Sequence, residues 1–331
     1  MRLRPALGEA SLAIAYGFFY GERNLDRAIS ELSRTAELMP SSTEVPLTLA
    51  SIYLQQQKVR DRIAALQRAE TLDPRDANVL RTLSNTFRWV RNWQEDLRTQ
   101  DKIRALLPDE PSITSVWTRA STEFRLTGDI NVVKQVTERA PAGVDPQLLI
   151  AFRYDTALLQ RDYATAERLI GERKVFFPPY TKAVQEGLLE VARGAEPATT
   201  QPALESARAE IEKLLLEDAG DSTLHIILGQ IHAFAGRKEE AIREGRRAIE
   251  LSPGWLEKND ASAGLALIYA RTGEAEEAIT MIEYLLTVPA SLNRYWSMTL
   301  TELKWFWEWD PLRSHPRFQK ILAEPEPETI Y

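Results

Sequence analysis

Apolar residues recur at spacings of three and four residues through the first third of the chain, the period of an amphipathic helix. Each second amphipathic segment ends at a proline, and Pro40, Pro74 and Pro108 stand 34 residues apart. Two helices of about 13 residues and two short turns fill such a period, and a proline cannot continue the second helix. The pattern therefore predicts a series of helix-turn-helix repeats.

The predicted helices repeat their contents as well as their length. An aromatic residue stands 21 positions before each of these prolines, at Phe19, Tyr53 and Phe87. An aromatic at that position packs inside a helix pair, and small residues elsewhere let two helices approach closely. Residues 222–253 and 260–289 follow the same plan. Their small, aromatic and proline positions are Gly229, Gly236, Ala241, Ala248 and Pro253, then Ala266, Tyr269, Gly273, Ala278 and Pro289.

This set of positions resembles the tetratricopeptide repeat family. The resemblance implies an all-α fold, a right-handed α-solenoid in which the first helix of each repeat lies on the concave wall. We expect seven complete repeats, one repeat with an insertion, and a C-terminal capping helix, because an end repeat has no neighbour to cover its apolar face.

The strict period weakens in the middle of the chain. Residues 194–202 contain two prolines and form a connector longer than a repeat turn, which predicts an exposed insertion inside an atypical repeat. We therefore expect N-terminal repeats over 1–193 and C-terminal repeats over 203–322. The acidic residues 323–331 are predicted to be a disordered tail.

Three tryptophans alternate near the C-terminus, at Trp305, Trp307 and Trp309. Alternating residues do not share one helix face, so we expect an irregular turn after a capping helix over 292–304. Its rings either seal the end of the core or form an exposed docking patch for another domain.

The string WFWEWDPLRSHPRFQKIL, from Trp305 to Leu322, resembles the closing motif of a bacterial group. In that group tetratricopeptide repeats follow an adenylate or guanylate cyclase domain, a Ser/Thr protein kinase domain or a DNA-binding response domain. Residues 16–108 resemble the same group. The resemblance implies a regulatory role in bacterial signalling, with an effector domain in cis or in trans, and it transfers no catalytic activity because no effector domain is recognisable in the chain.

The composition of the chain excludes several kinds of reactive or binding site. The 331 residues include no cysteine and three histidines, so disulfides, cysteine zinc sites and cysteine nucleophiles are excluded. A net charge of −7 argues against direct binding to nucleic acid. No stretch approaches the roughly 20 apolar residues of a membrane span, and a chain without cysteine suits a reducing cytoplasm, where we expect it.

No phosphate loop, nucleophile elbow or HExxH pair is present. His225 and His232 share one predicted helix face without a third metal ligand, and we interpret them as packing residues. The acidic pairs at 239–240 and 276–277 recur at one position of two repeats, which indicates helix starts rather than catalytic carboxylates. We therefore predict no enzymatic activity, no cofactor and no metal.

The third repeat carries the candidate binding surface. Leu80, Leu83 and Phe87 should face the core, whereas the opposite stripe is polar, without an acidic residue between Ala77 and Gln94. Arginine and asparagine bind the backbone and carboxylates of an extended peptide, and tryptophan covers an apolar side chain. The alternative is a solvated arginine face without a partner. The candidate residues are Asn78, Arg81, Asn85, Arg88, Trp89, Thr118, Thr122 and Arg125.

The leading interpretation is a noncatalytic scaffold whose concave groove binds a protein or peptide partner with acidic or carboxylate groups. Two alternatives stay open: a subunit for envelope assembly or secretion, and an all-helical toroidal enzyme that uses carboxylates. An enzyme requires acidic side chains that converge in a closed cavity, whereas a scaffold presents an open groove.

Overall fold

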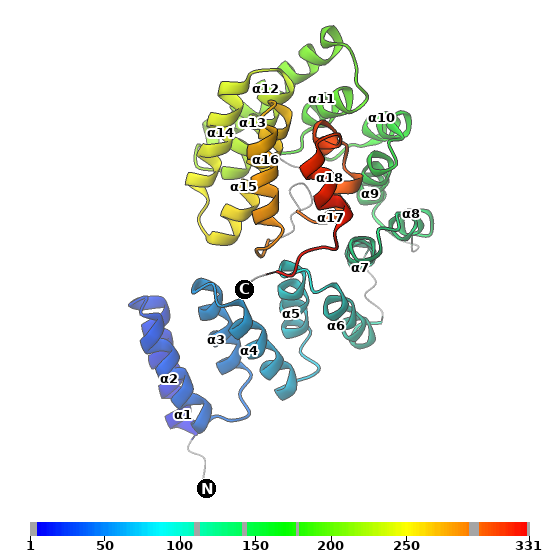
Figure 1. Cartoon of the computed structure of the whole chain (residues 1–331). Coiled ribbons are helices and arrows are strands. Elements are labelled where there is room, and N and C mark those ends of the chain that lie inside the picture. Colours follow the sequence, from blue (N-terminus) through cyan, green and yellow to red (C-terminus); the bar gives the residue numbers. More distant parts are fainter. Residues whose placement is uncertain (1–4, 109–112, 141–143, 177–178, 291–297, 330–331) are drawn as a thin grey trace. The chain divides into compact units, whose positions relative to one another are not determined.

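The helices of the chain pair in the order in which the sequence presents them. The computed structural model describes residues 5–108, 113–140, 144–176, 179–290 and 298–329. Within these ranges the helices α1 to α16 form eight successive hairpins, which a C-terminal segment of shorter helices follows (Figure 1). The all-α prediction is confirmed, and the eight hairpins equal the expected number of repeats.

Two compact units divide the chain. Unit 1 holds the described residues up to Arg88 and those from Gln94 to Pro108, and unit 2 holds Trp89–Trp93 and the described residues that follow. The hairpins of unit 1 are α1 (Pro5–Tyr16) and the π-helical turn η1 (Gly17–Gly21) with α2 (Leu25–Leu38), α3 (Glu44–Gln55) with α4 (Val59–Leu72), and α5 (Ala77–Trp89) with α6 (Trp93–Leu106).

The core of unit 1 lies between consecutive hairpins. Phe19 packs with Leu32 and Ile52, and Phe87 packs with Leu66 and with other apolar residues of α3, α4 and α5. Phe19 is 5% exposed and Phe87 4%, so these two predicted aromatic positions are inside the helix pairs, whereas Tyr53 is half-buried against the same core.

Unit 2 continues the same plan over five hairpins. They are α7 (Ile113–Thr127) with α8 (Asn131–Glu138), α9 (Pro146–Leu159) with α10 (Tyr163–Glu172), α11 (Lys182–Ala192) with α12 (Pro197–Glu217), α13 (Ser222–Phe234) with α14 (Lys238–Leu251), and α15 (Trp255–Arg271) with α16 (Ala275–Leu285). Gly229 shows why small residues recur: a Cβ there would lie 2.7 Å from Cδ1 of Ile268 and 3.0 Å from the carbonyl oxygen of Ala241. Glycine thus permits the close approach of α13 to its neighbours.

One residue with a positive φ lies in the turn of every described hairpin. The left-handed conformation ends the first helix and reverses the chain, and it costs a non-glycine residue about 1–2 kcal/mol. Four turns use glycine at this position, but the other four do not. The residues are Arg23, Gln57, Arg91, Gly128, Arg161, Gly194, Gly236 and Gly273.

The sequence had led us to expect the C-terminal segment beyond the last repeat. The segment lies inside unit 2 instead. It comprises α17 (Leu300–Trp305), the 3₁₀ turn η2 (Trp307–Leu312) and α18 (Pro316–Ala323). α17 packs against α7, η2 against α15, and α18 against α16 (Figure 1). The segment therefore contacts both the first and the last hairpin of unit 2.

This arrangement buries the rings of Trp307 and Trp309 and half-buries that of Trp305. Trp307 and Trp309 are each 5% exposed, Trp307 stacks on Phe234 of α13 with 5.6 Å between ring centroids, and Trp305 meets Phe124 of α7 edge-on. They pack within unit 2 and form no exposed docking patch. The predicted capping helix over 292–304 is observed only from Leu300, and residues 291–297 lie outside the described ranges.

Two predicted boundaries differ from the structure. The expected exposed connector over 194–202 is mostly helix, because α12 begins at Pro197, where a helix needs no backbone N–H, and continues through Pro202. Two closely spaced prolines had indicated a break. The compact units also divide at places other than residue 194: at the α5–α6 turn, whose residues Trp89–Trp93 belong to unit 2, and between α6 and α7.

The tail predicted to be disordered over 323–331 is ordered in its described part. Glu326 accepts hydrogen bonds from Trp93 and Leu300, and Thr329 is 4% exposed. Composition alone predicted disorder because the donors that hold these side chains lie far away in the sequence.

We predict that the C-terminal segment is part of the core of unit 2. Phe318 of α18 is 0% exposed, so Phe318→Ala should lower the free energy of unfolding by about 3–5 kcal/mol. Lys320→Ala, on the same helix with a 77% exposed side chain, should change it by less than about 0.5 kcal/mol. Urea unfolding followed by tryptophan fluorescence measures this, since every described tryptophan lies in unit 2. Equal midpoints for the two variants would contradict the packing.

Candidate functional site

The predicted polar stripe is present on α5 of unit 1. Leu80, Leu83 and Phe87 are buried, as expected, while Asn78, Arg81 and Asn85 are exposed on the opposite side of the helix. Asp76 starts the helix, because its carboxylate accepts hydrogen bonds from the backbone N–H groups of Asn78 and Val79, at 2.8 and 3.2 Å. Local sequence therefore fixes which side of α5 is polar.

Arg88 belongs to a network between α5 and α6. Its Nε lies 3.8 Å from Oδ2 of Asp96, whose side chain is 0% exposed. Ser84 donates to the other oxygen of Asp96, and Gln100 donates to Oδ2 at 2.9 Å. Since a buried carboxylate needs a compensating charge, Arg88 has a structural role in unit 1. The sequence analysis missed it because Asp96 lies on the next helix.

The other four candidate residues lie in unit 2, where three of them are on α7. Thr118 is half-buried, and Thr122 is 0% exposed with its hydroxyl donating to the carbonyl of Thr118. Nε of Arg125 donates to Oε1 of Glu302 at 3.0 Å, and Nη2 of Arg125 lies 2.9 Å from the same oxygen. Its side chain is 12% exposed, so its guanidinium is engaged with the C-terminal segment. The fourth, Trp89, accepts a hydrogen bond from Ala290 N–H at its carbonyl.

Further arginines hold the C-terminal segment. Arg161, in the α9–α10 turn, makes a two-pronged ion pair with Asp310, at 2.6 and 2.8 Å. Arg271, at the end of α15, donates to the carbonyls of Trp307 and Glu308 at 2.6 and 2.7 Å, and its guanidinium lies over the Trp307 ring. Burial lowers the pKa of Arg271 to about 10.

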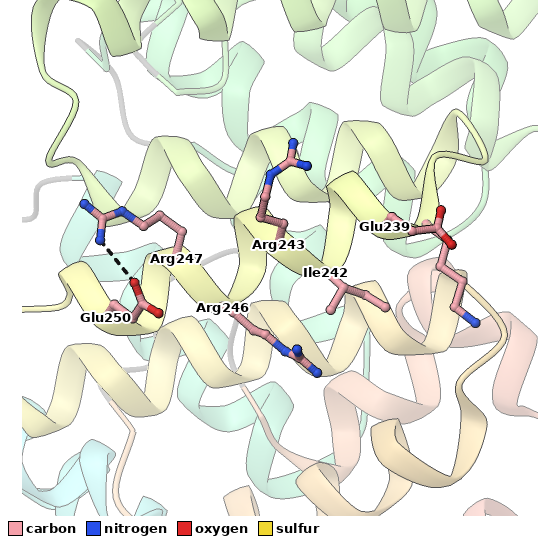
Figure 2. Close-up of a pocket in the computed structure, with 7 residues that line it drawn as sticks. Glu239, Ile242, Arg243, Arg246, Arg247 and Glu250 are labelled. Carbon is pink, nitrogen blue, oxygen red and sulfur yellow. Dashed lines mark hydrogen bonds and ion pairs between the residues drawn. The ribbon is translucent and has the colours of Figure 1, made fainter.

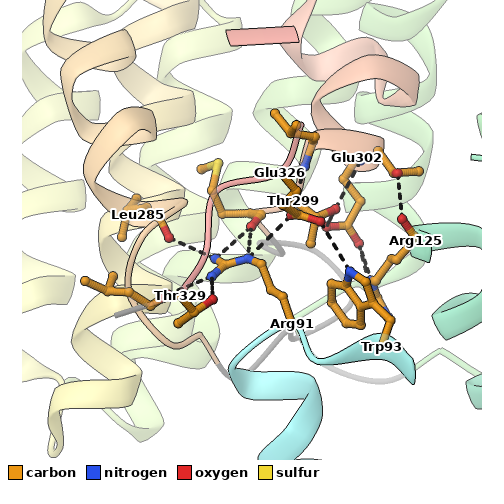
Figure 3. Close-up of polar contacts among 12 residues, drawn as sticks. Arg91, Trp93, Arg125, Leu285, Thr299, Glu302, Glu326 and Thr329 are labelled. Carbon is orange, nitrogen blue, oxygen red and sulfur yellow. Dashed lines mark hydrogen bonds and ion pairs between the residues drawn. The ribbon is translucent and has the colours of Figure 1, made fainter. Parts of the chain in front are cut away.

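Arg91, in the α5–α6 turn, has partners in several segments of unit 2. Its guanidinium donates to the carbonyls of Leu285, Val288 and Met298 at 2.8 to 3.1 Å, and to the Thr329 hydroxyl at 3.0 Å (Figure 3). The sequence analysis did not predict the contacts of Arg91 and Arg161. The sequence feature that could have indicated them is an arginine at the turn position where other repeats have glycine.

A small cavity of about 60 Å³ lies between the C-terminal segment and α9, α11, α13 and α15. Gln230 lines it, is 5% exposed, and has no hydrogen-bond partner for Nε2. Glu308 also lines it, and burial raises the pKa of its carboxyl to about 7. A polar cavity of this size accommodates water molecules.

The histidines of α13 pack between helices. Nδ1 of His225 lies 2.7 Å from Oε2 of Glu244 on α14, and Nε2 lies 3.2 Å from the carbonyl of Ala219. His232 is 7% exposed, and burial lowers its pKa. Both positions agree with the packing interpretation.

An open hollow of about 590 Å³ lies on α14. Arg243, Arg246 and Arg247 border it together with Glu239 and Glu250 (Figure 2). The arginines have acceptors within the chain: Arg247 pairs with Glu250 at 3.1 Å, and Arg246 donates to the Tyr269 hydroxyl at 3.3 Å. The acidic residues expected at the starts of α14 and α16 are in their first turns.

Two features are absent from the described ranges. No helix there has the length and apolar character needed to cross a bilayer. In the same ranges, no three histidine or acidic side chains gather in a geometry that would hold a metal ion.

Eight consecutive helix pairs with buried aromatic and small positions define a tetratricopeptide-type α-solenoid. Residues 204–254 match the tetratricopeptide repeat family. A tetratricopeptide repeat protein from Parabacteroides merdae ATCC 43184 shares the fold, with a TM-score of 0.54 and 15% identity over 79% of this chain and 98% of that chain.

Two other solved structures are more distant. Yeast Tom70 gives a TM-score of 0.34 at 14% identity over 85% of this chain and 69% of that chain. Naa15/Naa10 bound to HypK-THB gives 0.39 at 11% identity, over 84% of this chain and 53% of that chain. No curated protein sequence matches the chain.

We predict that Glu308 makes unit 2 less stable at alkaline pH. Its folded pKa of about 7 exceeds the usual value of 4.5, so its stabilising contribution is complete below pH 4.5 and is lost as the pH rises through 7. Between pH 5 and pH 8 the loss should be about 2 kcal/mol, and Glu308→Gln should remove it.

Urea unfolding at several pH values measures this difference. The control is Glu324→Gln, since the Glu324 side chain is 61% exposed and should leave the pH profile as it is. If the profile of Glu308→Gln matches that of the unchanged protein, the carboxyl titrates near its ordinary pKa.

Proposed function

We propose that the chain is a noncatalytic scaffold that binds an extended, acidic peptide segment of a protein partner. The observation that carries the proposal is the exposed stripe of Asn78, Arg81 and Asn85 along α5, opposite three buried apolar residues. Arginine and asparagine at one-turn spacing match the carboxylates and backbone amides of an extended peptide.

Differences in exposure among the candidate residues support α5 as the binding surface. The side chain of Arg125 is 12% exposed beside Glu302, and that of Arg88 is 21% exposed beside a buried carboxylate, so neither is readily accessible to a ligand. Arg81 keeps its exposure on the helix surface. We therefore assign partner binding to Asn78, Arg81 and Asn85, and assign structural roles to the other two arginines.

We further propose a cytoplasmic, regulatory role in bacterial signalling, in which the scaffold connects a partner to an effector domain. The resemblance of residues 305–322 to the closing motif of cyclase- and kinase-linked repeats supports it. Recovery of a cyclase, a kinase or a DNA-binding domain as the bound partner would agree with this role. Recovery of envelope or secretion components would favour the alternative.

The binding surface is tested with fluorescein-labelled extended peptides that are acidic, neutral or basic. We expect saturable binding of an acidic peptide, measured by fluorescence anisotropy. Arg81→Glu should weaken it by about tenfold or more, because a charge-assisted hydrogen bond contributes about 1.5–3 kcal/mol.

Arg98→Glu on α6 is the matched control. Arg98 has a 66% exposed side chain in the same unit, and its reversal changes the net charge by the same amount. It should leave the affinity unchanged, and both variants should keep the melting temperature of the unchanged protein. Equal weakening by both variants would indicate only general attraction, and no weakening by Arg81→Glu would exclude α5 as the binding surface.

A further inference from the structure

The α5–α6 turn of unit 2 holds a buried arginine whose position does not depend on the tail. Arg91 is 7% exposed, and its guanidinium donates to the backbone carbonyls of Leu285, Val288 and Met298. These three acceptors precede the tail in the sequence and belong to α16 and the segment that follows it. Removal of the tail therefore leaves Arg91 held in place.

Three donors surround one carboxyl group of the tail, two from residues 91–93 and one from Leu300 (Figure 3). Nε1 of Trp93 donates to Oε2 of Glu326 at 3.3 Å, and the backbone N–H of Leu300 donates to Oε1 at 3.2 Å. Nε of Arg91 lies 3.6 Å from the same Oε1. Three residues further on, the Thr329 hydroxyl accepts from Nη1 of Arg91 at 3.0 Å. The site thus engages a carboxyl and a hydroxyl at a fixed separation.

The tail is attached more weakly than the helix before it. Glu324, Pro325, Pro327 and Glu328 are exposed, and residues 324–329 bury no large apolar side chain. α18, in contrast, is anchored by Phe318 at 0% exposure. Burial raises the pKa of Glu326, although Arg91 and the two N–H donors act in the opposite direction. Because residues 324–329 have no apolar anchor of their own and α18 keeps Phe318 in the core, the tail is able to leave without disturbing α18.

The sequence of the tail favours reversible docking. Proline on both sides of Glu326 restricts the undocked tail to extended conformations, so less conformational entropy is lost when it docks. Any peptide with proline on both sides of a glutamate would likewise lose less conformational entropy when it binds.

We propose that Arg91, Trp93 and the Leu300 amide form a binding site for an extended acidic peptide with a proline-flanked glutamate and a hydroxyl residue three positions later. The tail of this chain is the exchangeable occupant of the site. An acidic segment of a partner protein binds when it displaces the tail. This site is separate from the α5 surface, so either proposal stands without the other.

The test uses a fluorescein-labelled peptide with the tail sequence EPEPET and a chain that ends at Ala323. We expect saturable binding to the shortened chain by fluorescence anisotropy. The full chain should bind at least about tenfold more weakly, because a site that its own tail occupies for nine-tenths of the time loses that factor in apparent affinity. A peptide with alanine in place of its second glutamate, the equivalent of Glu326, is the control and should not bind.

Two variants separate site chemistry from folding. In the full chain, Glu326→Ala with Thr329→Ala should free the site and restore peptide binding without a deletion. In the shortened chain, Trp93→Phe removes the indole donor and should weaken binding several-fold, measured well below its melting temperature because Trp93 is only 6% exposed. Equal affinity of the full and shortened chains, binding of the alanine peptide, or no binding to either freed form would each overturn the proposal.

Discussion

The burial of arginine guanidinium groups against the C-terminal segment is the constraint on which the organisation of unit 2 depends. A guanidinium removed from water must have its donors satisfied, and losing such partners is strongly destabilising. Arg91 meets this requirement with four acceptors from residues about 200 positions later in the chain, and Arg271 with the carbonyls of Trp307 and Glu308 in the C-terminal segment. These contacts require the C-terminal segment to lie inside the unit.

The backbone of the repeat turns explains why arginine is available for this purpose. The turn position has a positive φ, which glycine adopts freely, and Arg91 and Arg161 adopt it at a cost of about 1–2 kcal/mol each. Arg23 and Gln57 hold the same conformation in unit 1 and are exposed, as Arg161 is. At the buried Arg91, the hydrogen bonds of the guanidinium offset the backbone strain. The repeat itself therefore places a side chain where it meets the segment.

The sequence predicted what depends on local periodicity. Helical spacing, the 34-residue interval and the aromatic positions led correctly to eight helix pairs, because each depends on residues within one or two repeats. The path of the C-terminal segment depends on contacts such as Arg125 with Glu302, 177 positions apart, which no local pattern encodes. Pro197 was misread for a related reason: a proline ends one helix and begins another equally well, and only the surrounding packing decides.

The difference between local pattern and contacts distant in sequence also divides the arginines of the candidate site into two groups. A run of basic residues without acidic neighbours in the sequence predicted one continuous binding stripe. Asp96 and Glu302, each almost completely buried, draw Arg88 and Arg125 into the fold from other helices. An arginine next to a buried carboxylate stabilises the protein and is poorly suited to exchange that partner for a ligand, because the carboxylate would be left without a counter-charge. Displacement suits the tail better, because Glu324, Pro325, Pro327 and Glu328 around the docked Glu326 are exposed. Arg81 differs from Arg88 and Arg125 in lying on the exposed surface of α5.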